Sequence, residues 1–246
     1  MEISLLTDVG QKRTNNQDYA NLFVNRAGKT LIILADGMGG HRAGNIASEM
    51  AVTDLGAAWV DTQIDSVNQV REWFAEHLEE ENQRIHQFGQ DEEYKGMGTT
   101  LEALAIIDNQ AIYAHIGDSR IGLIRGDEYR QLTNDHSLVN ALLKAGQITP
   151  EEAERHPQKN IITQSIGQKD EVQPDYGMIT LEDGDYLLLN SDGLTNMISD
   201  SEICDIVISD ISLSEKTETL IRFANNAGGL DNITVALVRF DKEDKA

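Results

Sequence analysis

Short runs of apolar residues alternate with polar segments along the chain, and most runs are too short to form helices. Seven runs predict β-strands: residues 31–35, 101–107, 111–116, 121–124, 175–181, 186–189 and 233–240. The segment AIIDNQAIYAHIGD, residues 105–118, indicates a hairpin that turns at Asp108-Asn109. The central runs lie close together in sequence, which is typical of antiparallel pairing.

Apolar residues spaced by three and four predict four helices. They cover residues 43–59 and 67–88, a segment that begins at Thr149, and a segment between Ser212 and Gly228-Gly229. Capping-box patterns mark three of the starts: Ser66 with Gln69, Thr149 with Glu152, and Ser212 with Glu215. Strands outnumber helices and do not alternate with them regularly, unlike a parallel α/β sheet. The pattern predicts an α+β fold of mostly antiparallel sheets with helices packed outside.

The composition restricts the partners and the compartment. Lys and Arg number 20 against 42 Asp and Glu, a net charge of −22, which argues against nucleic acid and anionic membrane as partners. The single cysteine, Cys204, excludes an internal disulfide, and its helical spacing from Ile208 indicates a core thiol. The start of the chain does not resemble a signal peptide, and no apolar run approaches the ~20 residues of a membrane span. We expect a cytoplasmic protein with one domain over residues 1–246.

Aspartates recur at the ends of the predicted strands. Asp36, Asp118 and Asp192 each follow a strongly apolar run, whereas Asp18 and Asp231 precede apolar segments. A single such aspartate is most simply a turn former, but converging strand ends would crowd several carboxylates into one pocket. Crowded, buried carboxylates must protonate or bind cations, and oxygen ligands suit Mg²⁺ or Mn²⁺. Two such ions ~3.5–4 Å apart form the usual clamp for phosphoryl hydrolysis.

The segment LIILADGMGGHRAG, residues 31–44, has three glycines in four positions after Asp36. A glycine at position 37 leaves its backbone carbonyl open to an ion. The segment is not a dinucleotide-binding turn, because Arg42 stands where the third glycine of that motif belongs. The chain contains no P-loop and no H-E-x-x-H zinc motif. Cys204 lacks the arginine six positions further on that a cysteine-dependent phosphatase needs.

Eight stretches, in this order, resemble the metal-dependent Ser/Thr protein phosphatases of the 2C family, and most of all its compact bacterial members. They are TDVGQKRTNNQD (7–18), LADGMGGHRAG (34–44), GMGTT (96–100), HIGDSR (115–120), LTNDHS (132–137), ITQSIG (162–167), LLLNSDGLTN (188–196) and GGLDNITV (228–235). Each is weak alone, but together they cover essentially the whole chain. The resemblance implies two antiparallel sheets packed face to face as a sandwich, with helices on both sides and metals at one end.

The resemblance also implies roles for individual residues. Asp36 would bridge two ions. The Gly37 carbonyl would bind one of these ions, and Asp192 and Asp231 would bind the other. Asp18 would hold metal-bound water, Asp118 with Asp192 would bind a third, looser ion, and Arg13 would bind phosphate. His41 would protonate the leaving alkoxide, although bound water could supply that proton and His41 could instead bond to the backbone at a helix start. His115 and His136 are expected to be structural. Residues 137–169 match the family's flap beside the active site, with a surface insertion as the alternative.

The implied activity is hydrolysis of phosphoserine and phosphothreonine in proteins, with a metal-bridging hydroxide attacking phosphorus directly. Two ions, Mn²⁺ or Mg²⁺, would serve it, with the third as an addition. The implied partners are phosphorylated proteins, including a eukaryotic-type Ser/Thr kinase and its targets, and the protein is expected to be a monomer. Two alternatives stay open: a non-catalytic scaffold of the same fold, and a phosphatase dedicated to one regulatory partner.

Overall fold

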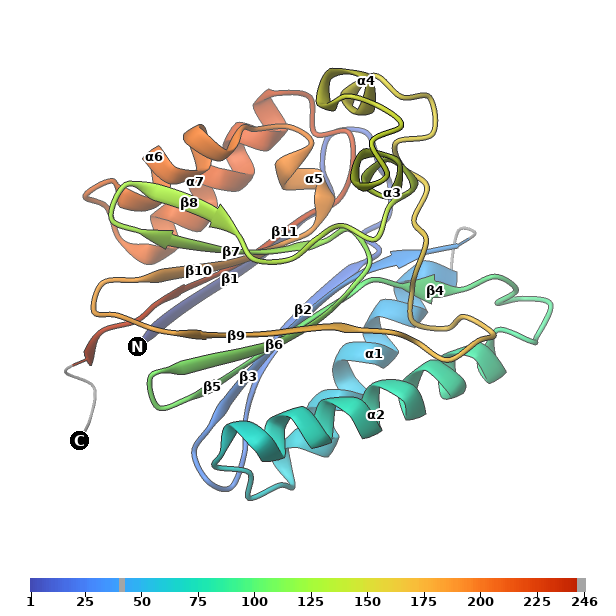
Figure 1. The fold of residues 1–246 in the computed structure, drawn as a ribbon, viewed down its shortest axis with the longest axis horizontal. Helices are drawn as coiled ribbons and strands as arrows, with labels where there is room; N and C mark the ends of the chain where they lie inside the picture. The colour runs from blue at the N-terminus through green and yellow to red at the C-terminus, as the bar shows by residue number, and fades with distance from the viewer. Residues whose placement is uncertain (40–42, 243–246) are drawn as a thin grey trace.

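Two antiparallel sheets lie face to face in the computed structural model, which describes residues 1–39 and 43–242 (Figure 1). The first sheet has the order β1 (Glu2–Asp8), β11 (Ile233–Arg239), β10 (Tyr186–Asn190), β7 (Arg120–Arg125), β8 (Glu128–Gln131). The second has the order β2 (Asp18–Val24), β3 (Thr30–Met38), β5 (Leu101–Ile107), β6 (Gln110–Ile116), β9 (Asp175–Thr180), and the short β4 (Gly98–Thr99) pairs with the end of β3.

Helices cover the outer face of each sheet, so the molecule has four layers (Figure 1). Helices α1 (Ala43–Val60) and α2 (Val67–Phe88) pack on the second sheet, and α5 (Asp192–Thr195), α6 (Asp200–Ile208) and α7 (Leu213–Asn226) on the first. Helices α3 (Leu138–Lys144) and α4 (Pro150–Glu154) lie between β8 and β9 in the chain. The predicted α+β sandwich flanked by helices on both sides is confirmed.

Strand β3 shows why its apolar run is continuous. Leu31, Ile33 and Ala35 pack against the helices, whereas Ile32 and Leu34 face the other sheet. All five are fully buried, because successive side chains of a strand point to opposite faces and both faces are covered here. The strand therefore delivers its last residues to the end of the sandwich as part of a rigid, two-sided core.

Most local expectations agree with the structure, but one cap does not. Thr149 and Ser212 form complete capping boxes, and the β5–β6 hairpin turns at Asp108 with a φ of 54°. Ser66 makes no cap, because its hydroxyl donates to the Gln69 side chain (2.8 Å) instead of accepting from the helix backbone. Within residues 1–39 and 43–242, none of the helices combines the length and apolar composition that a bilayer crossing requires.

Candidate metal centre and cavity

Strand ends of both sheets bring the predicted aspartates together at one end of the sandwich. Asp18 opens β2 directly opposite Asp36 in β3. Asp192 opens α5 just after β10, Asp231 precedes β11, and Asp118 lies in the turn between β6 and β7. The sequence expectation that these strand ends converge therefore matches the positions of the five residues.

The electrostatics show how closely these carboxylates crowd one another. Burial raises the pKa of Asp36 well above its ordinary value, and the charges of Asp18, Asp192, Asp118 and Asp231 raise it further. Burial also raises the pKa of Asp18 and of Asp192 to about 6, and that of Asp118 to about 7. Such a cluster favours either protonation or a bound cation.

Asp18 is held by hydroxyl groups from the opposite sheet. Ser191 Oγ and Thr234 Oγ1 both donate to its Oδ2 at 2.7 Å. Its other oxygen, Oδ1, is buried and has no hydrogen-bond partner in the described part of the chain, and the same is true of Asp192 Oδ1. Buried acceptors are normally satisfied, so these two oxygens fit a cation or an ordered water held by one.

The side chains alone do not complete a cage. Among residues 1–39 and 43–242, no three acidic, histidine or cysteine side chains lie close enough together to hold an ion without further ligands. The negative charges of the cluster repel one another. Asp231 also forms an ion pair with Arg13, with Nη2 2.6 Å from Oδ2. Hard divalent cations take backbone carbonyls and water besides carboxylates, so the donor types present fit Mg²⁺ or Mn²⁺.

Gly37 follows Asp36 at the end of β3, where the first turn of α1 crosses the strand. A Cβ at position 37 would lie 2.0 Å from the carbonyl oxygen of Gly44 and 2.7 Å from that of Gln17. The Gly37 amide donates to the same Gln17 carbonyl at 3.0 Å. Only glycine fits at position 37. Its missing side chain allows the end of β3 and the start of α1 to lie in contact beside Asp36.

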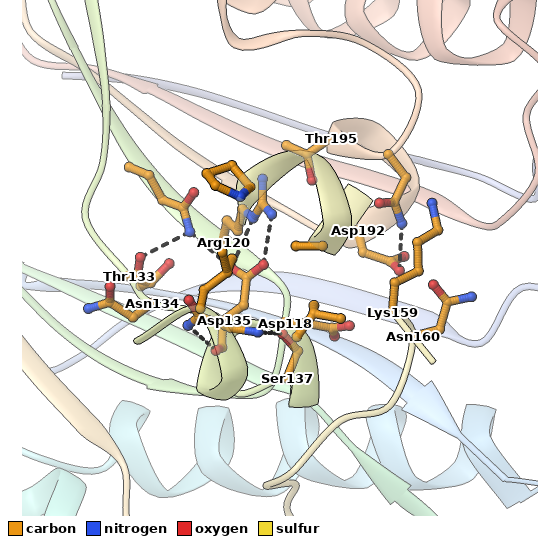
Figure 2. Close-up of a pocket in the computed structure, with 17 residues that line it drawn as sticks. Asp118, Arg120, Thr133, Asn134, Asp135, Ser137, Lys159, Asn160, Asp192 and Thr195 are labelled. Carbon is orange, nitrogen blue, oxygen red and sulfur yellow. Dashed lines mark hydrogen bonds and ion pairs between the residues drawn. The ribbon is translucent and has the colours of Figure 1, made fainter. Parts of the chain in front are cut away.

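A cavity of about 720 Å³ opens beside Asp118 and Asp192 (Figure 2). The 137–169 segment contributes several of the lining residues, Lys159 and Asn160 among them. Arg120 lines it as well and forms two bonds to one carboxylate, from Nε to Asp135 Oδ1 (3.0 Å) and from Nη2 to Oδ2 (2.7 Å). The cavity is therefore lined by carboxylates and cationic side chains together.

Comparison with known proteins gives this arrangement a context. The sequence pattern described as Protein phosphatase 2C matches residues 9–236. The chain belongs to the protein phosphatase 2C family. It is similar to Protein phosphatase PhpP of Streptococcus pneumoniae, with 84% identity over 244 residues and 99% of each chain covered. It is also similar to Serine/threonine phosphatase stp of Listeria monocytogenes, with 42% identity over 247 residues, 100% of this chain and 98% of that one.

A solved structure supports the same relationship. The serine/threonine phosphatase of S. agalactiae superimposes with a TM-score of 0.95 and 60% identity, covering 96% of this chain and 98% of that chain. Protein phosphatase 2C enzymes depend on metal ions, which agrees with the buried acceptor oxygens of Asp18 and Asp192.

Of the two predicted catalytic residues of this protein phosphatase 2C chain, the structure describes only Arg13. Arg13 lies in the loop between β1 and β2, half exposed, in contact with Asp231. His41, the expected general acid, lies outside the described residues. Cys204 is buried, as expected of a core thiol.

Asn232 is a site residue that the sequence reasoning missed. Its Oδ1 accepts from the Gln17 amide (2.8 Å), and its Nδ2 donates to the carbonyls of Val9 (2.9 Å) and Asn15 (3.0 Å). One buried amide thus ties the loop that carries Arg13 to the start of β11. The only sequence signal was a second polar residue between Asp231 and an apolar strand, which is equally typical of a turn.

Proposed function

We propose that this protein phosphatase 2C chain hydrolyses phosphoserine and phosphothreonine in proteins with divalent metal ions. The observation that carries the proposal is the convergence of five aspartates, with Asp18 Oδ1 and Asp192 Oδ1 lacking hydrogen-bond partners among the described residues and with Asp192 lining an open cavity. The names of the similar Streptococcus and Listeria proteins, both phosphatases, support the same activity.

The residues divide the work of binding the ions. Asp36, the Gly37 carbonyl, Asp192 and Asp231 would hold two Mn²⁺ or Mg²⁺ ions, and Asp118 with Asp192 a third. Bound there, the ions would supply positive charge that offsets the phosphate and would lower the pKa of water so that hydroxide is available near neutral pH. The charges of the other four aspartates all act on Asp36, which supports its place among the residues that would hold the ions.

The remaining steps belong to this chain's own groups. Asp18, fixed through Oδ2 by Ser191 and Thr234, would hold water at the ion site through Oδ1, which has no hydrogen-bond partner among the described residues. Arg13 binds the phosphate oxygens with its planar guanidinium, which matches two oxygens at once. His41 donates the proton that the departing serine or threonine alkoxide requires.

The open cavity and the family support phosphorylated proteins as substrates. Phosphorylated proteins, among them a eukaryotic-type Ser/Thr kinase and its targets, would present an extended phosphorylated segment to the cavity beside Asp118 and Asp192. We propose that the protein acts as a monomer in the cytoplasm. The 137–169 segment serves as a flap that selects among substrates, and it contributes Lys159 and Asn160 to the cavity lining. Exchange of this segment for that of a relative should change peptide preference; an unchanged preference contradicts the role.

The deciding experiment measures hydrolysis of a phosphothreonine peptide by the purified protein with Mn²⁺, with chelator, and in the Asp192→Ala variant. Metal-dependent turnover that collapses in Asp192→Ala supports the proposal. Asp205→Ala, which removes an exposed carboxylate on α6, is the matched control and should stay active. If the wild type binds Mn²⁺ without turnover, the alternative of a non-catalytic scaffold takes its place.

A further inference from the structure

A buried acid–base pair lies outside the aspartate cluster, in the apolar layer between the two sheets. Glu102 in β5 and His115 in β6 are direct cross-strand partners, and both side chains are fully buried. On the same face of β5 follow Leu104 and Ile106, which belong to the apolar layer. Burying two polar groups in such a layer costs free energy of folding unless they form hydrogen bonds with each other or with a third group.

The pair serves a third group, the backbone of Asn134. His115 Nδ1 lies 2.5 Å from Glu102 Oε1, and Nε2 lies 3.0 Å from the Asn134 carbonyl oxygen. Burial lowers the pKa of His115, but the Glu102 carboxylate outweighs it and raises the pKa above its ordinary value. Whether the shared proton lies on Glu102 or on Nδ1, Nε2 keeps its hydrogen and donates to Asn134, because the carbonyl can only accept.

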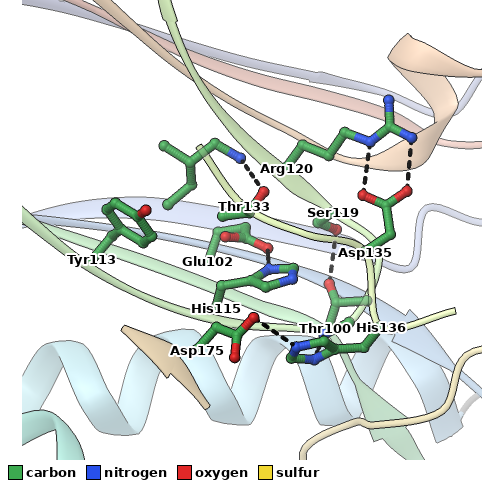
Figure 3. Close-up of polar contacts among 12 residues, drawn as sticks. Thr100, Glu102, Tyr113, His115, Ser119, Arg120, Thr133, Asp135, His136 and Asp175 are labelled. Carbon is green, nitrogen blue, oxygen red and sulfur yellow. Dashed lines mark hydrogen bonds and ion pairs between the residues drawn. The ribbon is translucent and has the colours of Figure 1, made fainter. Parts of the chain in front are cut away.

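The two residues that follow Asn134 are held by the same strand ends (Figure 3). Asp135 accepts both bonds of the Arg120 guanidinium. His136 exchanges two bonds with Gly117: its amide donates to the Gly117 carbonyl (2.6 Å), and its Nδ1 accepts from the Gly117 amide (3.2 Å). The His136 ring also lies against that of His115, with centroids 4.6 Å apart.

Residues 134–136 join the aspartate cluster to the flap. Gly117 directly precedes Asp118, and Ser137 directly precedes α3. On the other side, the His136 carbonyl accepts from the Thr163 amide (2.7 Å), and Ser137 forms a β-bridge with Ile162. Both ends of the flap are thus anchored on residues 134–136, the segment to which His115 is hydrogen-bonded.

We propose that His115, held by Glu102, is a positioning residue that fixes residues 134–136 between the Gly117–Asp118 turn and the base of the flap. The kinetic part of this inference rests on the proposed phosphatase function. Its structural part does not, since it concerns backbone hydrogen bonds of the folded chain.

The test removes the pair without leaving a buried charge. In Glu102→Val/His115→Leu both polar groups become apolar, an exchange that often costs a fold little or nothing. We expect hydrogen exchange at the amides of His136 and Thr163 to accelerate about tenfold or more. We expect kcat/KM for a phosphothreonine peptide to fall about tenfold to hundredfold, since small displacements far from the chemistry have effects of this size.

Two further variants separate positioning from mere stability. Ile106→Ala opens a cavity in the same layer without touching residues 134–136; it should lower the melting temperature but leave both readouts unchanged. In Glu102→Gln the new side-chain amide can still donate to His115 Nδ1, so Nε2 keeps its hydrogen and its bond to the Asn134 carbonyl. This variant should therefore retain kcat/KM to within about threefold.

The inference is overturned if the double variant exchanges its amides as slowly as the wild type and keeps the wild-type kcat/KM. It is also overturned if Ile106→Ala shows the same faster exchange and the same fall in kcat/KM as the double variant. If the double variant does not fold, Glu102→Gln/His115→Phe, which also leaves no buried charge and keeps a ring without donors, is read in the same way. A wild-type protein without phosphatase activity would contradict the proposed function, while the exchange rates would still decide this inference.

Discussion

Arg13 in the loop between β1 and β2 and Asp231 just before β11 form an ion pair, with Nη2 2.6 Å from Oδ2. The first is the expected phosphate ligand and the second an expected metal ligand. Half of the Arg13 side chain is exposed, so an incoming phosphate can reach its guanidinium. The pair therefore keeps each group neutralised and in place until a ligand competes for it.

Replacing Arg13 should separate catalysis from stability. In Arg13→Ala we expect kcat/KM for a phosphopeptide to fall about tenfold to hundredfold, because a hydrogen bond to a charged group contributes ~1.5–3 kcal/mol. The free energy of unfolding should change by less than about 1 kcal/mol, as for other exposed ion pairs. Arg26→Ala, which breaks the exposed pair with Asp61, is the control and should leave both quantities unchanged. A loss of activity equal in the two variants would argue against a phosphate role.

The raised pKa values of the cluster predict an unusual pH dependence for the metal-free protein. Asp18 and Asp192 titrate at about 6 and Asp118 at about 7, all above the ordinary 3.8. The folded state therefore binds protons more tightly than the unfolded state, and its stability falls as pH rises through this range. In chelator, the melting temperature should increase as pH is lowered from about 8 to about 5.

Metal should cancel that slope, because ions bind the deprotonated carboxylates and stabilise the folded state at high pH. Saturating Mn²⁺ should raise the melting temperature most at the upper end of the range. Asp192→Asn should flatten the slope in chelator, whereas Asp205→Asn on the surface should not. A melting temperature that climbs with pH in chelator would contradict the burial of these carboxylates.

Ser191 should tune the Asp18 carboxylate. Its hydroxyl bond lowers the pKa of Asp18 against the effect of burial, so Ser191→Ala should raise the Mn²⁺ concentration needed for half-maximal activity. Loss of this hydroxyl should also cost about 1–3 kcal/mol of stability. Thr217→Val removes a buried hydroxyl on α7 that bonds to Ser4 and Ser214 instead; it should lower stability without changing the Mn²⁺ requirement. Equal Mn²⁺ titrations for the two variants would exclude the proposed role.

Gly37 should tolerate no side chain. Gly37→Ala would place its Cβ against backbone carbonyls, so we expect a loss of about 3 kcal/mol or more together with loss of activity. Gly28→Ala is the matched control, since its φ is +73° but no atom lies within 4 Å of the added Cβ. It should cost about 1 kcal/mol and leave activity intact. Unfolding curves in urea and peptide assays at a temperature where both variants are folded measure the difference.

The parts of the fold that sequence predicts well are those with a strong local signal. The continuous apolar run at 31–35 and the periodic helices at 43–59 and 67–88 lie within β3, α1 and α2. By contrast, β1, β2 and β8 are partly exposed strands with polar residues, and α3 has no buried residue. Their conformation depends on neighbours distant in the chain, which propensity does not register.

The site shows the same division. Aspartates beside apolar runs could be found because the strands that carry them have a clear signal. The bonds from Ser191 and Thr234 to Asp18 join residues at opposite ends of the chain, and no local pattern marks them. The Glu102–His115 pair is likewise a matter of strand register, which the one-dimensional pattern leaves open.

The first strand of the chain pairs with the last. Residues Glu2–Asp8 of β1 align with Ile233–Arg239 of β11, and β1 lies at the edge of its sheet with β11 as its neighbour. During synthesis, β1 must therefore wait for β11 to leave the ribosome, and such distant pairings form slowly. Asp231 arrives with that same strand, so a nascent chain lacks both a finished sheet and a finished site. The phosphatase therefore cannot complete either its first sheet or its aspartate cluster before β11 has been synthesised.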